Sequence, residues 1–219
     1  MPPLETWTLW VHIAAGGLAI LAGLGALVTT KGGWRHRQAG KLFVASMGVV
    51  VGTVFLLLAF DLTAFRVFLA LVAVFSGYFA FSGYRVLSRK RPTDEARAID
   101  WLAAASVVLA CLGLGGWGIN QLINGASFGI VLVVFGGIGL AVGGSDVRRF
   151  RAADRQGEWM GIHLARMLAA FIATVSAVSA VNLTSLLGFV AWLWPTAVGV
   201  PLIIYWSRKY RTIVTRTKR

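Results

Sequence analysis

The chain has little charge, and what it has lies outside its long apolar runs. Only 13% of its 219 residues are Asp, Glu, Lys or Arg, whereas 58% are hydrophobic. A soluble domain carries about 25% charged residues. The scarcity of charge therefore argues against an ordinary soluble globular protein and indicates that a bilayer is the solvent.

Cysteine and acidic residues are also scarce. The single cysteine, Cys111, excludes an intramolecular disulfide and any metal site built from several cysteines. It falls in the middle of an apolar run, where a small packing residue is expected. The eight acidic residues form no row through the apolar runs, which disfavours a proton or cation pump. The last apolar run lacks lysine, which excludes a retinal Schiff base there.

Apolar runs long enough to cross a bilayer fill most of the chain. A hydrocarbon core of about 30 Å needs roughly 20 such residues per helix. Backbone polar groups in lipid need partners within the segment, and the alternation typical of membrane strands is absent, so the spans should be helices. We predict an all-α polytopic membrane protein, a seven-transmembrane-helix bundle. Its expected spans are Thr8–Thr29, Lys41–Phe60, Ala64–Tyr84, Ile99–Ile119, Ser127–Gly144, Met160–Val181 and Leu187–Trp206.

The net charge of +13 is segregated to one side of these spans. Basic residues gather in alternate connections, at residues 31–41, 85–97 and 148–155, and in the tail 208–219. Only Arg66 falls on the other side. By the positive-inside rule the N-terminus is outside and the C-terminus cytoplasmic, which an odd number of spans also requires. Because the basic residues serve as topology determinants, no nucleic-acid binding is expected.

We expect a single transmembrane domain, residues 1–207, followed by a basic cytoplasmic tail, residues 208–219. The tail should contact anionic lipid headgroups, an attraction of about 1 kcal/mol per basic residue. The first span is too long, and lacks the preceding basic residue, for a cleavable signal peptide. Thr93, followed by Asp94 and Glu95, is expected to be the N-cap of the fourth helix.

Glycine is abundant, and some of the 26 glycines recur at helix-packing spacing. Gly48 with Gly52, and Gly139 with Gly143, form small faces that allow close helix approach. Such faces suit either tight packing or a slot for a large planar cofactor. Pro195 and Pro201 should kink the last helix.

Ionisable side chains inside spans are costly in lipid and are therefore candidate functional residues. His163, Arg166 and Met167 share one face of the sixth span. His36 lies in the first basic connection, on the same predicted side, so His36 and His163 can converge. His12 lies on the opposite side, so the three histidines cannot form one site.

Paired imidazoles ligate haem iron, and a histidine with a methionine is another known pair. We therefore consider His163 and His36 as ligands of haem or of a transition metal, although the identity of any cofactor stays unknown. Met167 shares a helix with His163 and could not oppose it across one iron. Arg37 beside His36 would pair with haem propionates or with lipid phosphates. A zinc hydrolase site adding Glu158 or Asp154 has no familiar ligand spacing to support it.

Three segments resemble an uncharacterised bacterial family of small seven-helix membrane proteins, catalogued as a domain of unknown function. They are His12-Ile-Ala-Ala-Gly16, His36-Arg37-Gln-Ala-Gly40 and Trp159-Met-Gly-Ile-His163-Leu-Ala-Arg-Met167, continuing to Asn182. The resemblance implies a multi-pass protein of the bacterial inner membrane, with His12, His36 and His163 as the positions of interest. It implies no reaction. A looser likeness to di-haem b-type cytochromes fails, because the outer side has only His12.

Three functions remain open on the sequence alone. The first is a cofactor- or metal-binding membrane protein, redox-linked if the cofactor is haem, with its site near the cytoplasmic face. The second is a small-solute transporter or channel with a cavity near Thr174, Ser176, Asn182 and Pro195. The third is a structural or assembly subunit of a larger membrane complex, in which the partner is another membrane protein or a second copy of the chain.

Overall fold

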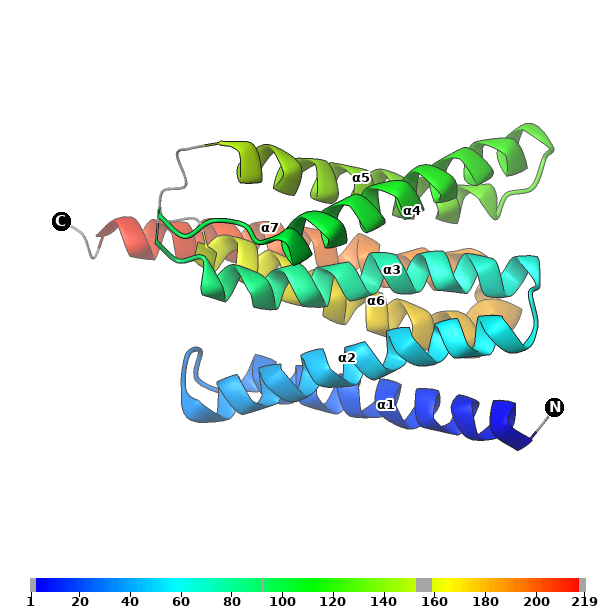
Figure 1. Ribbon diagram of the computed structural model, residues 1–219, viewed down its shortest axis with the longest axis horizontal. Coiled ribbons are helices and arrows are strands. Elements are labelled where there is room, and N and C mark those ends of the chain that lie inside the picture. The colour runs from blue at the N-terminus through cyan, green and yellow to red at the C-terminus, as the bar shows by residue number, and fades with distance from the viewer. Residues whose placement is uncertain (1–2, 92, 153–158, 217–219) are drawn as a thin grey trace. The chain divides into compact units, whose positions relative to one another are not determined.

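The computed structural model describes residues 3–91, 93–152 and 159–216, the last stretch from 209 onward by its backbone alone. Every regular element in these ranges is helical, and Figure 1 shows their order. The elements are α1 (Pro3–Val28), α2 (Trp34–Phe60), α3 (Ala64–Arg85), the short 3₁₀ helix η1 (Val86–Ser88), α4 (Ala98–Ile123), α5 (Gly129–Arg151), α6 (Trp159–Leu187) and α7 (Val190–Arg216). Seven helices are long and apolar enough to cross a membrane, which confirms that part of the prediction and suggests a multi-pass membrane protein.

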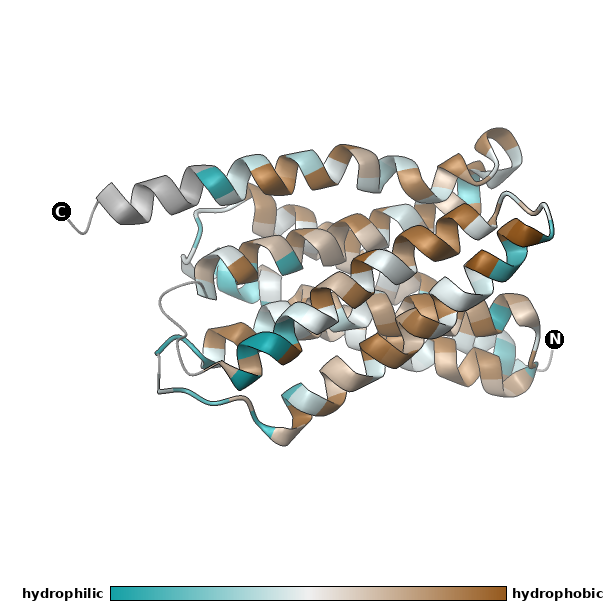
Figure 2. Cartoon of the chain, turned by 90° about the horizontal axis from the view of Figure 1, so that it is seen from above, coloured by the Kyte–Doolittle hydropathy of each residue, from teal (hydrophilic) through white to brown (hydrophobic). Residues whose placement is uncertain are grey.

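Apolar side chains dominate the surfaces of these helices as well as their contacts. Leu21, Leu109 and Val181 are 68%, 69% and 85% exposed. Figure 2 shows hydrophobic residues along the helices, with hydrophilic residues mostly near helix ends and in connections. Water disfavours so much exposed apolar surface, whereas lipid tails do not.

The chain divides into two compact units, which meet within α3: the first runs to Gly77 and the second begins at Tyr78. In the first unit α1 and α2 pack against each other. Ala15, Ala19 and Ala22 are buried at helical spacing along α1. No described atom lies within 4 Å of a Cβ built at Gly48 or Gly52, so the close approach expected at this pair is not made within the first unit.

In the second unit, glycines let α4 and α5 approach closely. Gly129, Gly136 and Gly143 recur every seventh residue along α5. A Cβ at Gly136 would lie 2.8 Å from the backbone nitrogen of Gly115, and one at Gly143 would lie 2.9 Å from a methyl of Val107. The expected close packing of the Gly139–Gly143 face is therefore present at Gly143. The same unit contains the packed pair α6 and α7.

Several helices extend beyond their predicted spans because hydropathy marks where apolar character ends, not where the helix ends. Helix α2 begins at Trp34 instead of Lys41, so His36 is helical rather than part of a connection. Helix α5 continues past Gly144 to Arg151, and α7 runs into the predicted tail as far as Arg216.

The prediction that Thr93 caps the fourth helix was wrong. Helix α4 begins at Ala98, with Arg97 at the N-cap position. The carboxylate of Asp100, in the first turn, accepts a hydrogen bond of 2.9 Å from the backbone N–H of Arg97. A carboxylate in the first turn also interacts favourably with the helix dipole.

Candidate functional site

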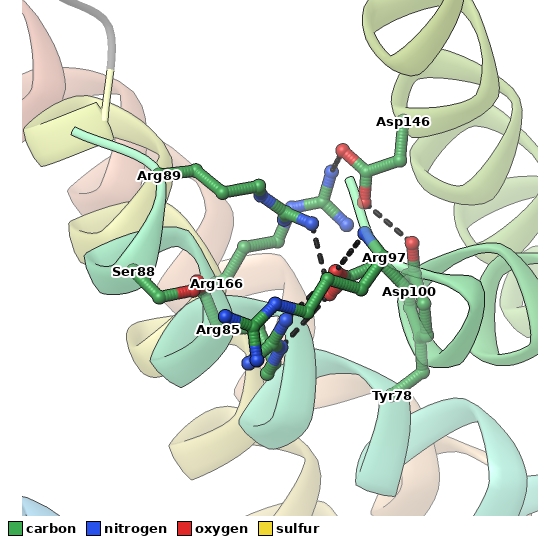
Figure 3. Close-up of polar contacts among 8 residues, drawn as sticks. All are labelled: Tyr78, Arg85, Ser88, Arg89, Arg97, Asp100, Asp146 and Arg166. Carbon is green, nitrogen blue, oxygen red and sulfur yellow. Dashed lines mark hydrogen bonds and ion pairs between the residues drawn. The ribbon is translucent and has the colours of Figure 1, made fainter. Parts of the chain in front are cut away.

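Ionisable side chains of the second unit converge where α3 and α5 end and where α4 and α6 begin. They come from elements that are far apart in sequence, and Figure 3 shows them pointing toward one another. We call this group the charge cluster, and its members are Tyr78, Arg85, Arg89, Asp100, Asp146 and Arg166. Such residues are costly in an apolar bundle, so the cluster is the leading candidate site.

Asp146 on α5 is the centre of the cluster and is only 5% exposed. Its Oδ2 accepts a hydrogen bond of 2.5 Å from the hydroxyl of Tyr78 on α3. Its Oδ1 lies 2.9 Å from Nη2 of Arg166 on α6, and both side chains of this ion pair are buried. Asp146 therefore links three helices through hydrogen bonds that charge strengthens.

Arg166 is buried and only partly satisfied. Besides Asp146, its Nη2 makes longer contacts of 3.4 Å with the Val142 carbonyl and the Ser145 hydroxyl. Its guanidinium carbon lies 5.9 Å from the ring centroid of Tyr78. Nη1 is buried and has no hydrogen-bond partner among the described residues. A buried donor without a partner costs about 1–3 kcal/mol, and more when it is charged.

The second carboxylate, Asp100 on α4, is engaged on both oxygens. Arg85 binds it through Nε and Nη2, at 3.0 and 2.9 Å from Oδ1 and Oδ2. Nη1 of Arg89 lies 2.8 Å from Oδ1. The cluster thus holds three guanidinium groups, on side chains that are 20%, 11% and 6% exposed, against two buried carboxylates. Arg149, which is more exposed, adds a further positive charge 3.5 Å from Asp146.

His163, a predicted ligand, lies beside the cluster on α6. Its Nδ1 lies 2.8 Å from the carbonyl oxygen of Gly83 on α3, and since a carbonyl only accepts, Nδ1 carries the proton. A Cβ at Gly83 would lie 2.9 Å from Cβ of Arg166 and 3.1 Å from Sδ of Met167. His163, Arg166 and Met167 therefore all lie next to Gly83, as expected for residues on one helical face.

The other predicted ligands belong to the first unit. Nδ1 of His36 lies 3.0 Å from the Ala26 carbonyl at the C-terminal end of α1, and Nζ of Lys31 donates to the same oxygen. Partial burial lowers the pKa of the Lys31 ammonium. Arg37 is exposed. Because His36 and His163 belong to different units, their meeting in one site stays a prediction.

His12 makes a hydrogen bond inside the first unit. Its Nδ1 lies 2.9 Å from the hydroxyl oxygen of Thr53, whose own proton is donated to the carbonyls of Val49 and Val50. Nδ1 of His12 must therefore be the donor. This bond ties α1 to α2 and accounts for a histidine in an apolar helix.

An ion pair that the sequence analysis missed ties α1 to α3 in the first unit. Nη2 of Arg66 lies 2.6 Å from Oε1 of Glu5, which is 5% exposed, and Nη1 donates to the Leu57 carbonyl at 2.6 Å. Arg66 was the only basic residue expected on the outer side, and the buried carboxylate of Glu5 requires such a partner.

In the described part of the chain, no three His, Cys, Asp or Glu side chains come together in a way that could hold a metal ion. Asp154 and Glu158 of the zinc hypothesis lie outside the described residues. Of the residues expected to line a polar cavity, Thr174 donates its hydroxyl proton to the Ala170 carbonyl of its own helix, and the buried Ser176 hydroxyl makes no hydrogen bond to the residues that the structure describes.

Asp146 and Tyr78 were not among the predicted site residues. The predicted fifth span stopped at Gly144, which placed Asp146 in a connection. Two signals pointed to it: Arg166 lies inside a span and needs a counter-charge, and acidic residues are few.

Comparison of the chain with protein-family models, with curated proteins and with solved structures finds no match.

Proposed function

We propose that this chain is a multi-pass protein of the bacterial cytoplasmic membrane that binds a ligand at the charge cluster. The distribution of basic residues supports an outside N-terminus and a cytoplasmic C-terminus. The arginine-rich segments 85–97 and 148–155 flank the helix ends that carry the cluster. With this orientation the cluster lies at the cytoplasmic side. The resemblance around His12, His36 and His163 supports the bacterial assignment.

The observation that carries the proposal is Nη1 of Arg166, which is buried and makes no hydrogen bond to any of the described residues. If the ion pair had only a structural role, each of its buried donors would be expected to have a partner, because every buried donor without one destabilises the fold. Here one guanidinium nitrogen is left over, and positive charge exceeds negative charge within the cluster. A bound ligand would supply the missing acceptor. The proposed activity is therefore binding, or transport that begins with binding, at this site.

Native mass spectrometry of the protein purified in a mild uncharged detergent tests this function. We expect a bound molecule on the wild-type protein and on Glu95→Gln, which neutralises an exposed acid in the same unit. The double variant Asp146→Leu/Arg166→Met replaces the buried pair by apolar side chains and should lose that molecule. A wild-type protein with no bound mass, or a double variant that keeps it, would contradict the proposal.

A second candidate function, the cofactor site at His163, is favoured by one observation. Metal-ligating histidines donate one ring N–H to a backbone carbonyl, which orients the ring and leaves the lone pair on the other nitrogen. Nδ1 of His163 makes such a bond to Gly83. Haem with His36 as second ligand, and with Arg37 at a propionate, is the form that the sequence suggests.

An absorption spectrum and elemental analysis distinguish this candidate from the first. A Soret band, or stoichiometric metal, that is lost in His163→Ala would establish a cofactor protein. A colourless and metal-free protein would reduce His163 to a residue that ties α6 to α3.

A further inference from the structure

We infer that the group bound at the charge cluster is a phosphate, held by Arg166 together with Arg89. This inference rests on the proposed function, because it names the chemistry of the ligand at the same site. Its two sources are the headgroup of an anionic phospholipid and a free phosphate compound.

Among the described residues, positive charge exceeds negative charge in the cluster, which favours an anionic ligand. Both oxygens of Asp100 are bound by Arg85, and one of them also lies against Arg89. Both oxygens of Asp146 are engaged as well, by Tyr78 and by Arg166. Both carboxylates thus already have cationic partners, and the cluster counts one more guanidinium than carboxylate, with Arg166 buried and Arg85 and Arg89 partly exposed. Burying a charge without compensation is costly, and an anionic ligand removes that cost.

Two arginine nitrogens of the cluster are buried and make no hydrogen bond among the described residues, which favours an oxyanion such as phosphate. Nη1 of Arg166 has no hydrogen-bond partner among the described residues. Nη1 of Arg89 is also buried and, although it lies 2.8 Å from Asp100, is not aligned for a hydrogen bond. Figure 3 shows the Arg166 side chain extending toward Asp146 and the Arg89 side chain toward Asp100. Donors from two guanidinium groups suit a tetrahedral phosphate, whose oxygens accept from several directions.

Aromatic rings hold the two arginines in place before any ligand binds. The guanidinium of Arg89 lies 4.9 Å from the ring centroid of Phe150 on α5, and that of Arg166 lies 5.9 Å from the ring of Tyr78. Such contacts are worth about 0.5–2 kcal/mol each. Because the donors are positioned in advance, less entropy is lost on binding.

The location at the predicted cytoplasmic side suits both sources of phosphate. Basic pockets between transmembrane helices on this side are typical sites for anionic headgroups. The side chain of Arg89 is 11% exposed and that of Arg166 is 6% exposed, so a ligand would meet Arg89 first.

The test measures the thermal unfolding midpoint of the delipidated full-length protein in maltoside detergent. One arm adds inorganic phosphate, with sodium acetate at equal ionic strength as its comparison. The other adds phosphatidylglycerol, with a galactosyl diacylglycerol, which carries neither phosphate nor charge, as its comparison. We expect one phosphate probe to raise the midpoint with saturation, in wild type and equally in Arg148→Gln, an exposed arginine on α5. Arg89→Gln should raise the half-saturating concentration at least tenfold, as should Arg166→Gln if it folds.

The outcomes separate the sources and the proposals. A response to inorganic phosphate identifies a soluble phosphate ligand, and a response to phosphatidylglycerol alone identifies a lipid. An equal response to acetate, no response in either arm, or an unchanged half-saturation in Arg89→Gln overturns the phosphate assignment. If native mass spectrometry still finds a bound molecule, the proposed function survives that failure. If it finds none, both fail together.

Discussion

Replacing Asp146 by asparagine should destabilise the protein strongly. Asparagine keeps the size of the side chain but removes its charge. Arg166, whose side chain is 6% exposed, would then be left as a buried cation without its counter-ion. The hydroxyl of Tyr78 would lose its charged acceptor at the same time.

The expected magnitude follows from these two contacts. Removing one partner of a buried ion pair costs about 3–5 kcal/mol. For a protein of this size, one kcal/mol lowers the unfolding midpoint by about 2–4 °C. We therefore expect Asp146→Asn to lower the midpoint by roughly 10 °C. The double variant Asp146→Leu/Arg166→Met should lie close to wild type or above it, because it removes both desolvation costs.

The assay is the fraction of protein that stays monodisperse on size-exclusion chromatography after heating in detergent. Glu95→Gln is the matched control, because it also removes one negative charge, but from an exposed side chain. It should change stability by less than about 0.5 kcal/mol. Two results would refute this prediction. One is an Asp146→Asn variant that is no less stable than Glu95→Gln. The other is a double variant whose destabilisation equals the sum of those caused by Asp146→Leu and by Arg166→Met.

Three further changes test neighbouring parts of the structure. Tyr78→Phe removes one hydrogen bond to a buried carboxylate and should cost about 1–3 kcal/mol in the same heating assay; an unchanged midpoint would contradict that bond. Gly83→Val places a side chain against α6 and should lower the free energy of unfolding by about 1–3 kcal/mol. Gly161→Ala, whose added methyl group meets open space, should leave the free energy of unfolding unchanged. Membrane topology is checked in a variant that lacks Cys111. Leu62→Cys should react with an impermeant maleimide in intact cells, and Arg35→Cys should react only after lysis. The reverse pattern would show that the orientation is opposite to the predicted one.

The sequence alone determined the number and type of elements. Each membrane helix satisfies its own backbone hydrogen bonds, so apolar run length is a local property that can be read without knowing the neighbours. For this reason the seven helices were predicted and found. Their ends were placed less well, because α5 and α2 continue as helices beyond the apolar residues into charged ones.

The candidate site was decided by tertiary structure. Arg166 was recognised as unusual from its position in a span, but no local pattern names its partner Asp146 on α5, or Tyr78 on α3, which binds the same carboxylate. Likewise, sequence identified His163 as notable, whereas the fold showed that its Nδ1 proton goes to Gly83. The packing of the helices decides which side chains meet. That packing depends on glycines such as Gly136, which contacts the backbone of α4 only when α4 and α5 are packed together. Hydropathy therefore predicts that the charges lie near a membrane face, and only the packed helices decide which charges neutralise one another.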